Sequence, residues 1–418
     1  MPRIAMIRKW WLALLGVSLL IISCSKEGAG IVDDDGDSDD KTPPMTIVDL
    51  EIASFGTEYV VLEWTAPGDD SVTGFAFEYD LRGSLDSVTA GNFQEAYRID
   101  SIDAPLPPGT TQSCQIDSLT SGETYYFAIK TRDDNGNWSG ISNCVSITCL
   151  VDQVIVFPDE ALDSLVRATV GMQTGDIHLS DVEGMDELMA EDVGISDLSG
   201  LESCTDLKRV ILPGSNISDL TPLASLPQLL TLNLINNNVT SISQLSQMGT
   251  VIQLHLGENP ISDISSLSNM TQLEWLRLNS TKVTDFSPIY SLPSLKELDL
   301  SGNALGDNIG FVTNFSQIKK LALNANSIAN IDALSSMTNV ENLQLVFNNL
   351  SDITALQGLT NLTELYLDYN QIADISPLVN NSGLGSGDVV YLQNNPLSVP
   401  STDSYISTLQ ARGVTVYY

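Results

Sequence analysis

The side chains best suited to catalysis are few and far apart in this 418-residue chain. Neither of its two histidines, His178 and His255, has a nearby nucleophile with a sharp turn or oxyanion donors. Carboxylates such as Glu297 and Asp299 superficially mimic a glycosidase pair, but we expect them on neighbouring strands of an open surface. The sequence also lacks a glycine-rich phosphate loop and a cluster of metal ligands. We therefore predict a protein with no enzymatic activity, cofactor or metal site.

The cysteines are candidates for disulfides or for a reactive thiol. Cys114, Cys144, Cys149 and Cys204 allow three connectivities, and no two of them form the CxxC pair of a zinc site. Cys114 and Cys149 are the pair that we consider for a bridge. Cys204 lies in "LESCTDL", where we expect a small buried thiol beneath a repeat. A bridge from Cys204 to the preceding domain is the alternative.

Composition and charge limit the class of protein. The length suggests two or three domains, and an apolar fraction of 43% is ample for their cores. There are 53 acidic and 18 basic side chains, which give a net charge of −35. A surface this acidic repels nucleic acid and anionic lipid headgroups. Nucleic acid is therefore excluded as a partner.

The N-terminus has the features of an export signal. Three basic residues precede the apolar run from Trp10 to Ser23, which is shorter than the about 20 residues that span a bilayer. The run ends in "IISC", which resembles a bacterial lipobox, and this resemblance implies that Cys24 carries a lipid. Residues 1–23 are thus predicted to be a lipoprotein signal peptide. The alternative is an ordinary signal peptide with a cysteine nearby.

Residues 24–44 are predicted to be a disordered acidic tether. The stretch "GIVDDDGDSDDKTPP" contains six aspartates and no aromatic residue, so it cannot bury enough apolar surface to fold. The alternating aspartates could bind calcium, but the distal glutamate and the defined turn of a calcium loop are missing. We therefore interpret the segment as a solvated spacer.

Residues 45–150 have the pattern of an all-β sandwich. Short alternating runs separated by turn signals predict strands at 59–64, 75–81, 113–119, 125–132 and 144–149. Trp64 is suited to the core, and Tyr125 follows a turn as in a tyrosine corner. The region resembles a fibronectin type III domain. Domains of this family can bind partners, but in multidomain surface proteins they more often act as spacers, and the resemblance therefore implies a spacer here.

A repeat determines the architecture of residues 185–397. The pattern L-x-x-L-x-L-x-x-N-x-I/L places its second apolar residue at Val210, Leu232, Leu254, Leu276, Leu298, Leu321, Leu343 and Leu365. The step is 22 residues, with one step of 23 between Leu298 and Leu321. This period is the signature of a leucine-rich repeat, in which each L-x-L forms a short strand with its leucines inside. The second halves are rich in Ser, Asp and Pro and too short for a regular long helix, so we expect 3₁₀ turns or extended segments on the convex side.

An asparagine follows the strand in most turns of the repeat. These residues are Asn237, Asn259, Asn303, Asn326, Asn348, Asn370 and Asn395. Their side-chain amides can satisfy backbone groups that the bend would otherwise bury without partners. Ser215 and Thr281 replace asparagine in two turns, so we expect weaker hydrogen bonding there.

The segments on either side of the repeats are predicted to cover its ends. Residues 151–184 form the N-terminal cap, with a helix expected in 157–171. Residues 398–418 form the C-terminal cap, with a short helix that stops at Gly413 and a final strand. The cap and the period resemble the internalin-like class of bacterial leucine-rich repeat proteins. The resemblance implies protein binding through the concave face, whereas the identity of the partner does not carry over.

The outward positions of the strands and bends are where we expect a partner to bind. The candidate residues are Tyr366, Tyr369, Phe347, Tyr391, Trp275, Arg277 and His255. Four aromatic residues gather in the last turns, and Phe347 and Tyr369 are expected to stack on adjacent strands about 5 Å apart. Tyrosine and phenylalanine dominate many interfaces. They could equally shield the end of the solenoid.

Together these features predict a membrane-anchored binding or adhesion protein of the cell envelope. The alternatives are a carbohydrate-binding module and a purely structural one. Ser25 follows Cys24 in place of the aspartate that commonly signals inner-membrane retention, so we favour the outer membrane or cell surface. The membrane would be reached through the lipid anchor alone.

Overall fold

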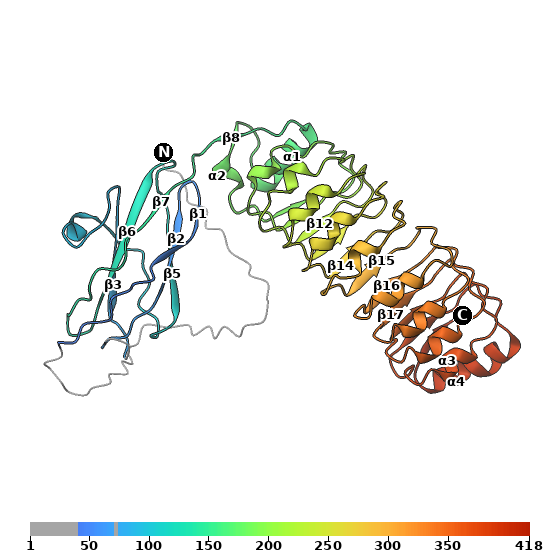
Figure 1. Ribbon diagram of the computed structural model, residues 1–418. Coiled ribbons are helices and arrows are strands. Elements are labelled where there is room, and N and C mark those ends of the chain that lie inside the picture. Colours follow the sequence, from blue (N-terminus) through green and yellow to red (C-terminus); the bar gives the residue numbers. More distant parts are fainter. Residues whose placement is uncertain (1–40, 71–73) are drawn as a thin grey trace. The chain divides into compact units, whose positions relative to one another are not determined.

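The computed structural model describes residues 41–70 and 74–418 (Figure 1). The predicted signal peptide, the lipidation site Cys24 and most of the tether lie outside the described residues. Two compact units divide the chain. The larger unit comprises Ile52–Val61, Gln115–Tyr125 and Ser146–Tyr418. The smaller unit comprises the described residues up to Glu51 together with Leu62–Cys114 and Tyr126–Val145.

The strands before residue 150 form two sheets. The first has the order β1 (Glu51–Phe55), β2 (Val60–Thr65), β5 (Thr111–Ile116). The second has the order β4 (Tyr97–Ile99), β3 (Glu78–Ser84), β6 (Thr124–Arg132), β7 (Val145–Thr148), and a 3₁₀ turn, η1 (Phe93–Glu95), precedes β4. Trp64 is buried, as the sequence predicted, and its ring meets the edge of Tyr79 with 5.3 Å between centroids. The hydroxyl of Tyr125 accepts a hydrogen bond from the backbone N–H of Thr120 (3.0 Å).

No disulfide joins the four cysteines of the described residues, so the considered Cys114–Cys149 bridge is wrong for this structure. Cys114 belongs to β5, whereas Cys149 follows β7 of the other sheet, and both side chains are buried. Cys144 is exposed. Cys204 is buried in the core of the repeats, as expected, and burial raises the pKa of its thiol to about 12.

The repeats are preceded by two short strands, β8 (Val154–Ile155) and β9 (Ile177–His178), and two helices, α1 (Glu160–Val170) and α2 (Leu179–Val182). The carboxylate of Asp159 accepts two backbone N–H groups at the start of α1, and Gly171 ends the helix at φ 79°. Leu162 and Val166 of α1 are fully buried in the same core as the leucines of the repeats.

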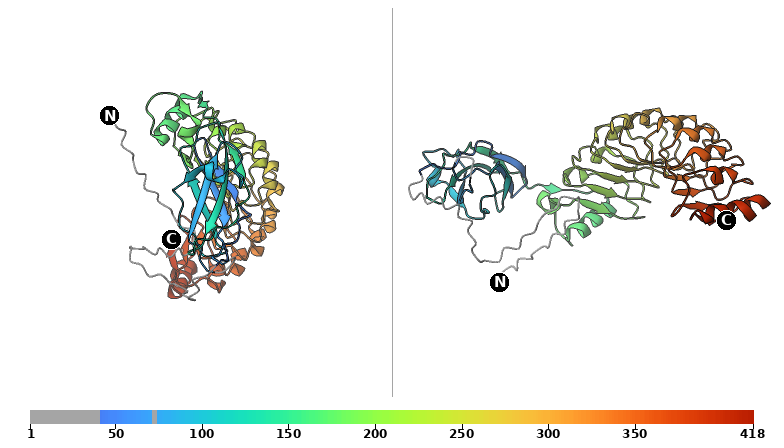
Figure 2. Two further views of the ribbon diagram at one scale, coloured as in Figure 1. Left: turned by 90° about the vertical axis from the view of Figure 1, so that its left-hand side faces the viewer. Right: turned by 90° about the horizontal axis from the view of Figure 1, so that it is seen from below.

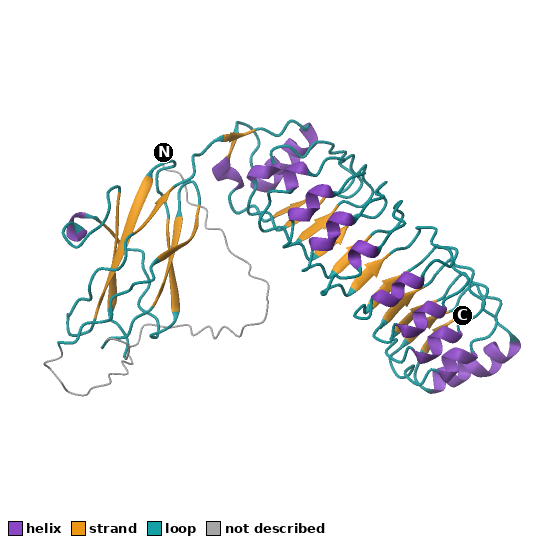
Figure 3. Cartoon of the chain, viewed as in Figure 1, coloured by secondary structure: helices purple, strands orange, loops and turns teal. Residues whose placement is uncertain are grey.

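The repeats build one sheet of eleven strands in chain order, all parallel (Figures 1 and 3). The strands are β10 (Glu187–Met189), β11 (Arg209–Ile211), β12 (Thr231–Asn233), β13 (Gln253–His255), β14 (Trp275–Arg277), β15 (Glu297–Asp299), β16 (Lys320–Ala322), β17 (Asn342–Gln344), β18 (Glu364–Tyr366), β19 (Val389–Tyr391) and β20 (Thr415–Tyr417). The middle residue of each strand opposes the middle residue of the next and points into the core. A continuous apolar core therefore runs along the solenoid.

Short helices alternate with the strands on the outer side of the curved solenoid (Figure 2). They are η2 (Leu201–Ser203), η3 (Thr221–Leu223), η4 (Ser243–Gln247), η5 (Ser265–Asn269), η6 (Ser287–Ile289), η7 (Gly310–Asn314), η8 (Asp332–Ser336), η9 (Thr354–Gly358) and α3 (Ser376–Asn380). All but α3 are 3₁₀ helices, which is one of the two forms predicted for these short segments rich in Ser, Asp and Pro. After them come a π-helical turn, η10 (Ser401–Tyr405), and α4 (Ile406–Ala411), and Gly413 at φ 92° leads into β20.

The asparagines form the predicted ladder of buried hydrogen bonds. The amide nitrogen of Asn348 donates to the carbonyls of Leu323 (2.9 Å) and Leu345 (3.1 Å), and its oxygen accepts the N–H of Ile328 (2.9 Å). Each residue thus ties its own turn to the turn before it. At the position of Ser215, by contrast, the buried hydroxyl has no partner. The ladder is weaker there, as expected.

Replacing Asn348 by alanine should lower the free energy of unfolding by about 1–3 kcal/mol, because buried backbone groups lose their partners. Ser215→Ala is the matched control and should change stability by less than about 0.5 kcal/mol. Chemical denaturation of the full chain checks both values. Equal effects of the two substitutions would show that the asparagine ladder does not carry this stability.

Candidate functional site

The concave face of the solenoid presents two columns of outward side chains, one on each side of the buried middle residue of every strand. The first column holds Glu187, Arg209, Thr231, Gln253, Trp275, Glu297, Lys320, Asn342, Glu364, Val389 and Thr415. The second column holds Met189, Ile211, Asn233, His255, Arg277, Asp299, Ala322, Gln344, Tyr366, Tyr391 and Tyr417. Residues of one column stand side by side on successive strands.

This face is almost neutral in a strongly acidic protein. Its two columns contain four acidic and three basic side chains, a net charge of −1, whereas the whole chain carries −35. Arg209 pairs with Glu187 (2.9 Å), and Lys320 pairs with Glu297 (3.6 Å). A partner can therefore approach the concave face without strong repulsion or attraction from the residues that it meets.

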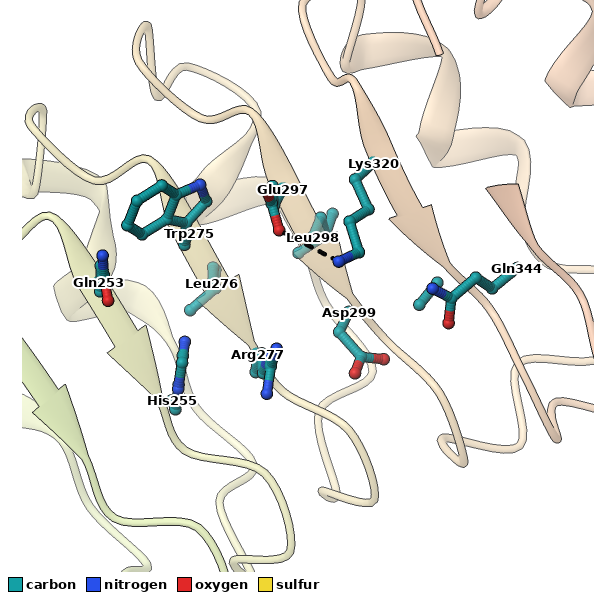
Figure 4. Close-up of a pocket in the computed structure, with 11 residues that line it drawn as sticks. Gln253, His255, Trp275, Leu276, Arg277, Glu297, Leu298, Asp299, Lys320 and Gln344 are labelled. Atoms are coloured by element: carbon teal, nitrogen blue, oxygen red, sulfur yellow. Dashed lines mark ion pairs between the residues drawn. The ribbon is translucent and has the colours of Figure 1, made fainter. Parts of the chain in front are cut away.

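A pocket of about 390 Å³ lies at the centre of the face (Figure 4). It brings together three of the residues predicted from the sequence, namely His255 on β13 and Trp275 and Arg277 on β14. Other residues that line it are Gln253, Glu297, Asp299, Lys320, Ala322 and Gln344. The sequence shows which side chains face outward, but it does not show which of them enclose a pocket. That depends on where a small side chain lies between larger neighbours.

Glu297 and Asp299 lie on the same strand, β15, and not on neighbouring strands as expected from the sequence. Both side chains point to the concave face because one residue, Leu298, separates them. Glu297 is paired with Lys320, and one oxygen of Asp299 accepts the N–H of Ser301 (2.9 Å). The two carboxylates are therefore held by different partners.

His255 is kept neutral by its surroundings. Burial, together with the positive charge of Arg277, lowers the pKa of His255 to about 4, and the negative charge of Asp299 acts in the opposite direction. The imidazole thus adds a hydrogen-bonding group and no charge to the pocket at neutral pH.

Three tyrosines of the second column form a ladder at the C-terminal end of the sheet. The rings of Tyr366 and Tyr391 stack with 4.6 Å between centroids, and those of Tyr391 and Tyr417 with 4.9 Å. The Tyr366 hydroxyl donates to Glu364 (3.1 Å), and burial together with this contact raises the pKa of Tyr366 to about 12. The sequence reasoning missed Tyr417 because the repeat lengthens after Tyr366. The strand pattern of "GVTVYY" was the available signal.

Phe347 and Tyr369 form a separate stack, with 4.1 Å between ring centroids and an angle of 17° between the rings. They lie in the bends after β17 and β18 rather than on the strands themselves. Phe347 is 58% exposed and Tyr369 48%, and both have left-handed backbones with φ 57°. The four aromatic residues predicted as one patch are thus arranged in two stacks.

The described residues contain neither a candidate metal site nor a candidate membrane-spanning helix. Among residues 41–70 and 74–418, no group of three or more His, Cys, Asp or Glu side chains is placed to hold a metal ion. In the same residues, no helix is long and apolar enough to cross a membrane.

Comparison with known families identifies the repeats. The family described as "Leucine Rich repeats (2 copies)" matches residues 271–314 and 338–380, so the chain contains leucine-rich repeats. A comparison with curated proteins finds no match. The comparisons indicate no catalytic family.

Several solved structures are similar to part of this chain. An internalin (inlF) from Listeria monocytogenes has 27% identity and a TM-score of 0.46 over 63% of this chain and 89% of that one. An internalin C2 from the same organism has 24% identity and a TM-score of 0.42 over 57% and 94%. A plant peptide hormone receptor, RGFR1, solved in complex with RGF2, has 21% identity and a TM-score of 0.40 over 51% and 40%.

Replacing Arg277 by glutamine should raise the pKa of His255 above its value of about 4, because a positive charge beside the imidazole is removed. Asp299→Asn should lower that pKa further, since a stabilising negative charge is lost. An NMR titration of the two histidines measures both shifts, with the signals of His178 as the internal reference. A His255 pKa that does not respond to either change would contradict this account of the pocket.

Proposed function

We propose that this chain is a non-catalytic binding protein that recognises a protein partner on the concave side of its leucine-rich repeats. The exposed stack of Phe347 and Tyr369 supplies the main contact. One observation carries the proposal: two large aromatic side chains stand exposed at positions where the backbone disfavours them.

The left-handed conformation has a cost for any residue with a Cβ atom, about 1–2 kcal/mol relative to the right-handed one. The equivalent position in earlier turns holds Gly214, Asn236, Glu258, Ser280, Gly302 and Ala325, so the fold does not need an aromatic residue there. The strain at the two positions together is about 2–4 kcal/mol, and stacking of the two rings offsets only about 0.5–1.5 kcal/mol of it. Folding therefore gives no reason for Phe347 and Tyr369, whereas recognition of a partner does.

Tyr366, Tyr391 and Tyr417 extend the contact surface. Because their rings lie face to face, each covers a face of its neighbour and leaves its edge uncovered, and the Tyr366 hydroxyl donates to Glu364. A sugar ring stacks on an open aromatic face, and the inner faces of this ladder are occupied. Edges and hydroxyl groups instead suit the backbone and polar side chains of a protein. The arrangement therefore favours a protein partner over the carbohydrate alternative.

The same proposal places the protein in the bacterial cell envelope, at the outer membrane or the cell surface. The "IISC" motif supports a lipid on Cys24, and the acidic composition of residues 24–44 supports a spacer. The strand orders of the two N-terminal sheets and the Thr120–Tyr125 hydrogen bond support a fibronectin type III-like domain over residues 45–150. The helix α1, whose Leu162 and Val166 share the core of the repeats, supports a cap over the first turn.

A double substitution of Phe347 and Tyr369 by glycine should abolish partner binding and leave the thermal midpoint nearly unchanged, because glycine relieves the backbone strain as stacking is lost. Ser280→Gly combined with Ala325→Gly is the matched control at the same position of two other turns. Capture of proteins by the immobilised full chain, followed by mass spectrometry, compares the variants with the parent. Support requires a protein that the parent and the control retain and the double variant loses.

Two other outcomes of this experiment count against the proposal. A large fall in the thermal midpoint of the double variant would assign the stack to folding. Retention of the same proteins by all three chains would place the contact elsewhere, and capture of none would favour a purely structural role.

Cys24→Ala should prevent incorporation of a fatty-acid label and move the protein from the membrane fraction to the soluble fraction of the producing cells. Cys144→Ala, at an exposed thiol, is the matched control and should leave both unchanged. Labelling of the Cys24 variant would refute lipidation at this residue.

A further inference from the structure

The central pocket contains two opposite charges that do not pair with each other. Arg277 and Asp299 occupy register positions on the neighbouring strands β14 and β15, yet no ion pair joins them (Figure 4). Among the described residues, the guanidinium of Arg277 has no hydrogen-bond or ion-pair partner. Asp299 uses its Oδ1 atom to accept the N–H of Ser301, and its Oδ2 atom has no partner in the described chain.

Arg277 differs in this respect from the other arginines of residues 151–418. Arg167 pairs with Asp163 (2.7 Å), Arg209 pairs with Glu187 (2.9 Å), and Arg412 donates to the carbonyl of Asn381 (3.3 Å). In a chain with a net charge of −35, an arginine whose guanidinium has neither a carboxylate nor a carbonyl partner is unexpected. Its five N–H donors are available to a ligand.

The other charged groups of the pocket already neutralise each other. Lys320 and Glu297 neutralise each other, and His255 carries no charge at neutral pH. Gln344 donates to Asn342 (3.2 Å), and its oxygen accepts a hydrogen bond from Asn324 (3.2 Å). One positive and one negative group therefore remain for recognition, about one strand spacing apart.

The pocket has the size for a small ligand that meets both charges. Ala322 follows Asp299 in the second column, and its short, buried side chain leaves space between the larger Asp299 and Gln344. A volume of about 390 Å³ accommodates a group of a few non-hydrogen atoms with its hydration. Trp275 on the same strand as Arg277 adds an apolar wall.

We propose that this pocket binds a small α-amino acid in its zwitterionic form, with the carboxylate at Arg277 and the ammonium group at Asp299. A guanidinium binds a carboxylate through two parallel hydrogen bonds, and the Oδ2 atom of Asp299 accepts from an ammonium group. A dianion such as phosphate would be repelled by Asp299, and a simple cation would be repelled by Arg277. Only a ligand with both charges satisfies both residues.

The binding of an amino acid is independent of the proposed protein recognition, because it uses none of the aromatic residues at the C-terminal end. NMR titration of the full chain with L-alanine, N-acetyl-L-alanine and L-alanine methylamide tests it. The two blocked compounds each lack one of the charges. We expect L-alanine to shift the His255 signals saturably without moving those of His178, and each blocked compound to bind at least about tenfold more weakly, the effect of one lost charged hydrogen bond.

Substitutions in the pocket complete the test. Arg277→Gln and Asp299→Asn should each weaken L-alanine binding at least about tenfold. Asparagine retains the oxygen that accepts from Ser301, so Asp299→Asn should fold normally, and the thermal midpoint of each variant checks this. Arg209→Gln removes a positive charge from the same face outside the pocket and should leave binding unchanged.

Three results would overturn the proposal. One is the absence of a saturable His255 shift up to about 50 mM L-alanine. A dissociation constant above that concentration would be too weak for a specific site. Another is equal binding of N-acetyl-L-alanine, which would indicate a site for anions alone. A loss of binding in Arg209→Gln equal to that in Arg277→Gln would indicate a nonspecific charge effect. None of these results bears on Phe347 and Tyr369, so failure here leaves the protein-binding proposal standing.

Discussion

The solenoid depends on giving a hydrogen-bond partner to every backbone group that its tight bends bury. A strand of three residues forms few ladder bonds, and the bend that follows it turns N–H and carbonyl groups into the core. The asparagine ladder supplies these partners: Asn348 and its equivalents each bond at least one carbonyl and one N–H of the turn before. The buried leucines then stack in register because each turn repeats the path of the one before.

This requirement leaves the outward positions free to differ from turn to turn. The inward residues must be apolar, and most bends carry an amide, but nearly all the residues on either side of the middle residues face solvent. On the concave face these positions carry a nearly neutral surface, although the rest of the protein is strongly acidic. The acidic side chains are largely elsewhere, for example at Asp263 and Asp285, which accept N–H groups at the starts of the 3₁₀ helices and whose pKa values are thereby lowered.

Two different kinds of surface result on one face. At the C-terminal end, aromatic rings stack on successive turns because a parallel sheet places equivalent residues about 5 Å apart, close to the optimum for stacking. At the centre, a short side chain at Ala322 interrupts the column and leaves a pocket beside Arg277 and Asp299. A large extended partner suits the first surface and a small charged ligand the second.

The sequence by itself determined the repeat, because a 22-residue period of leucines and asparagines satisfies core and backbone in one arrangement only. The strands, the 3₁₀ turns, the amide ladder and the outward direction of Tyr366 and Arg277 all follow from that local pattern. The tertiary structure alone decided that Cys114 and Cys149 remain thiols, that Tyr417 joins the tyrosine ladder, and that Glu297 pairs with Lys320 while Arg277 and Asp299 stay apart. These outcomes depend on distances between turns and on which neighbouring side chains are small. A one-dimensional period specifies neither of these.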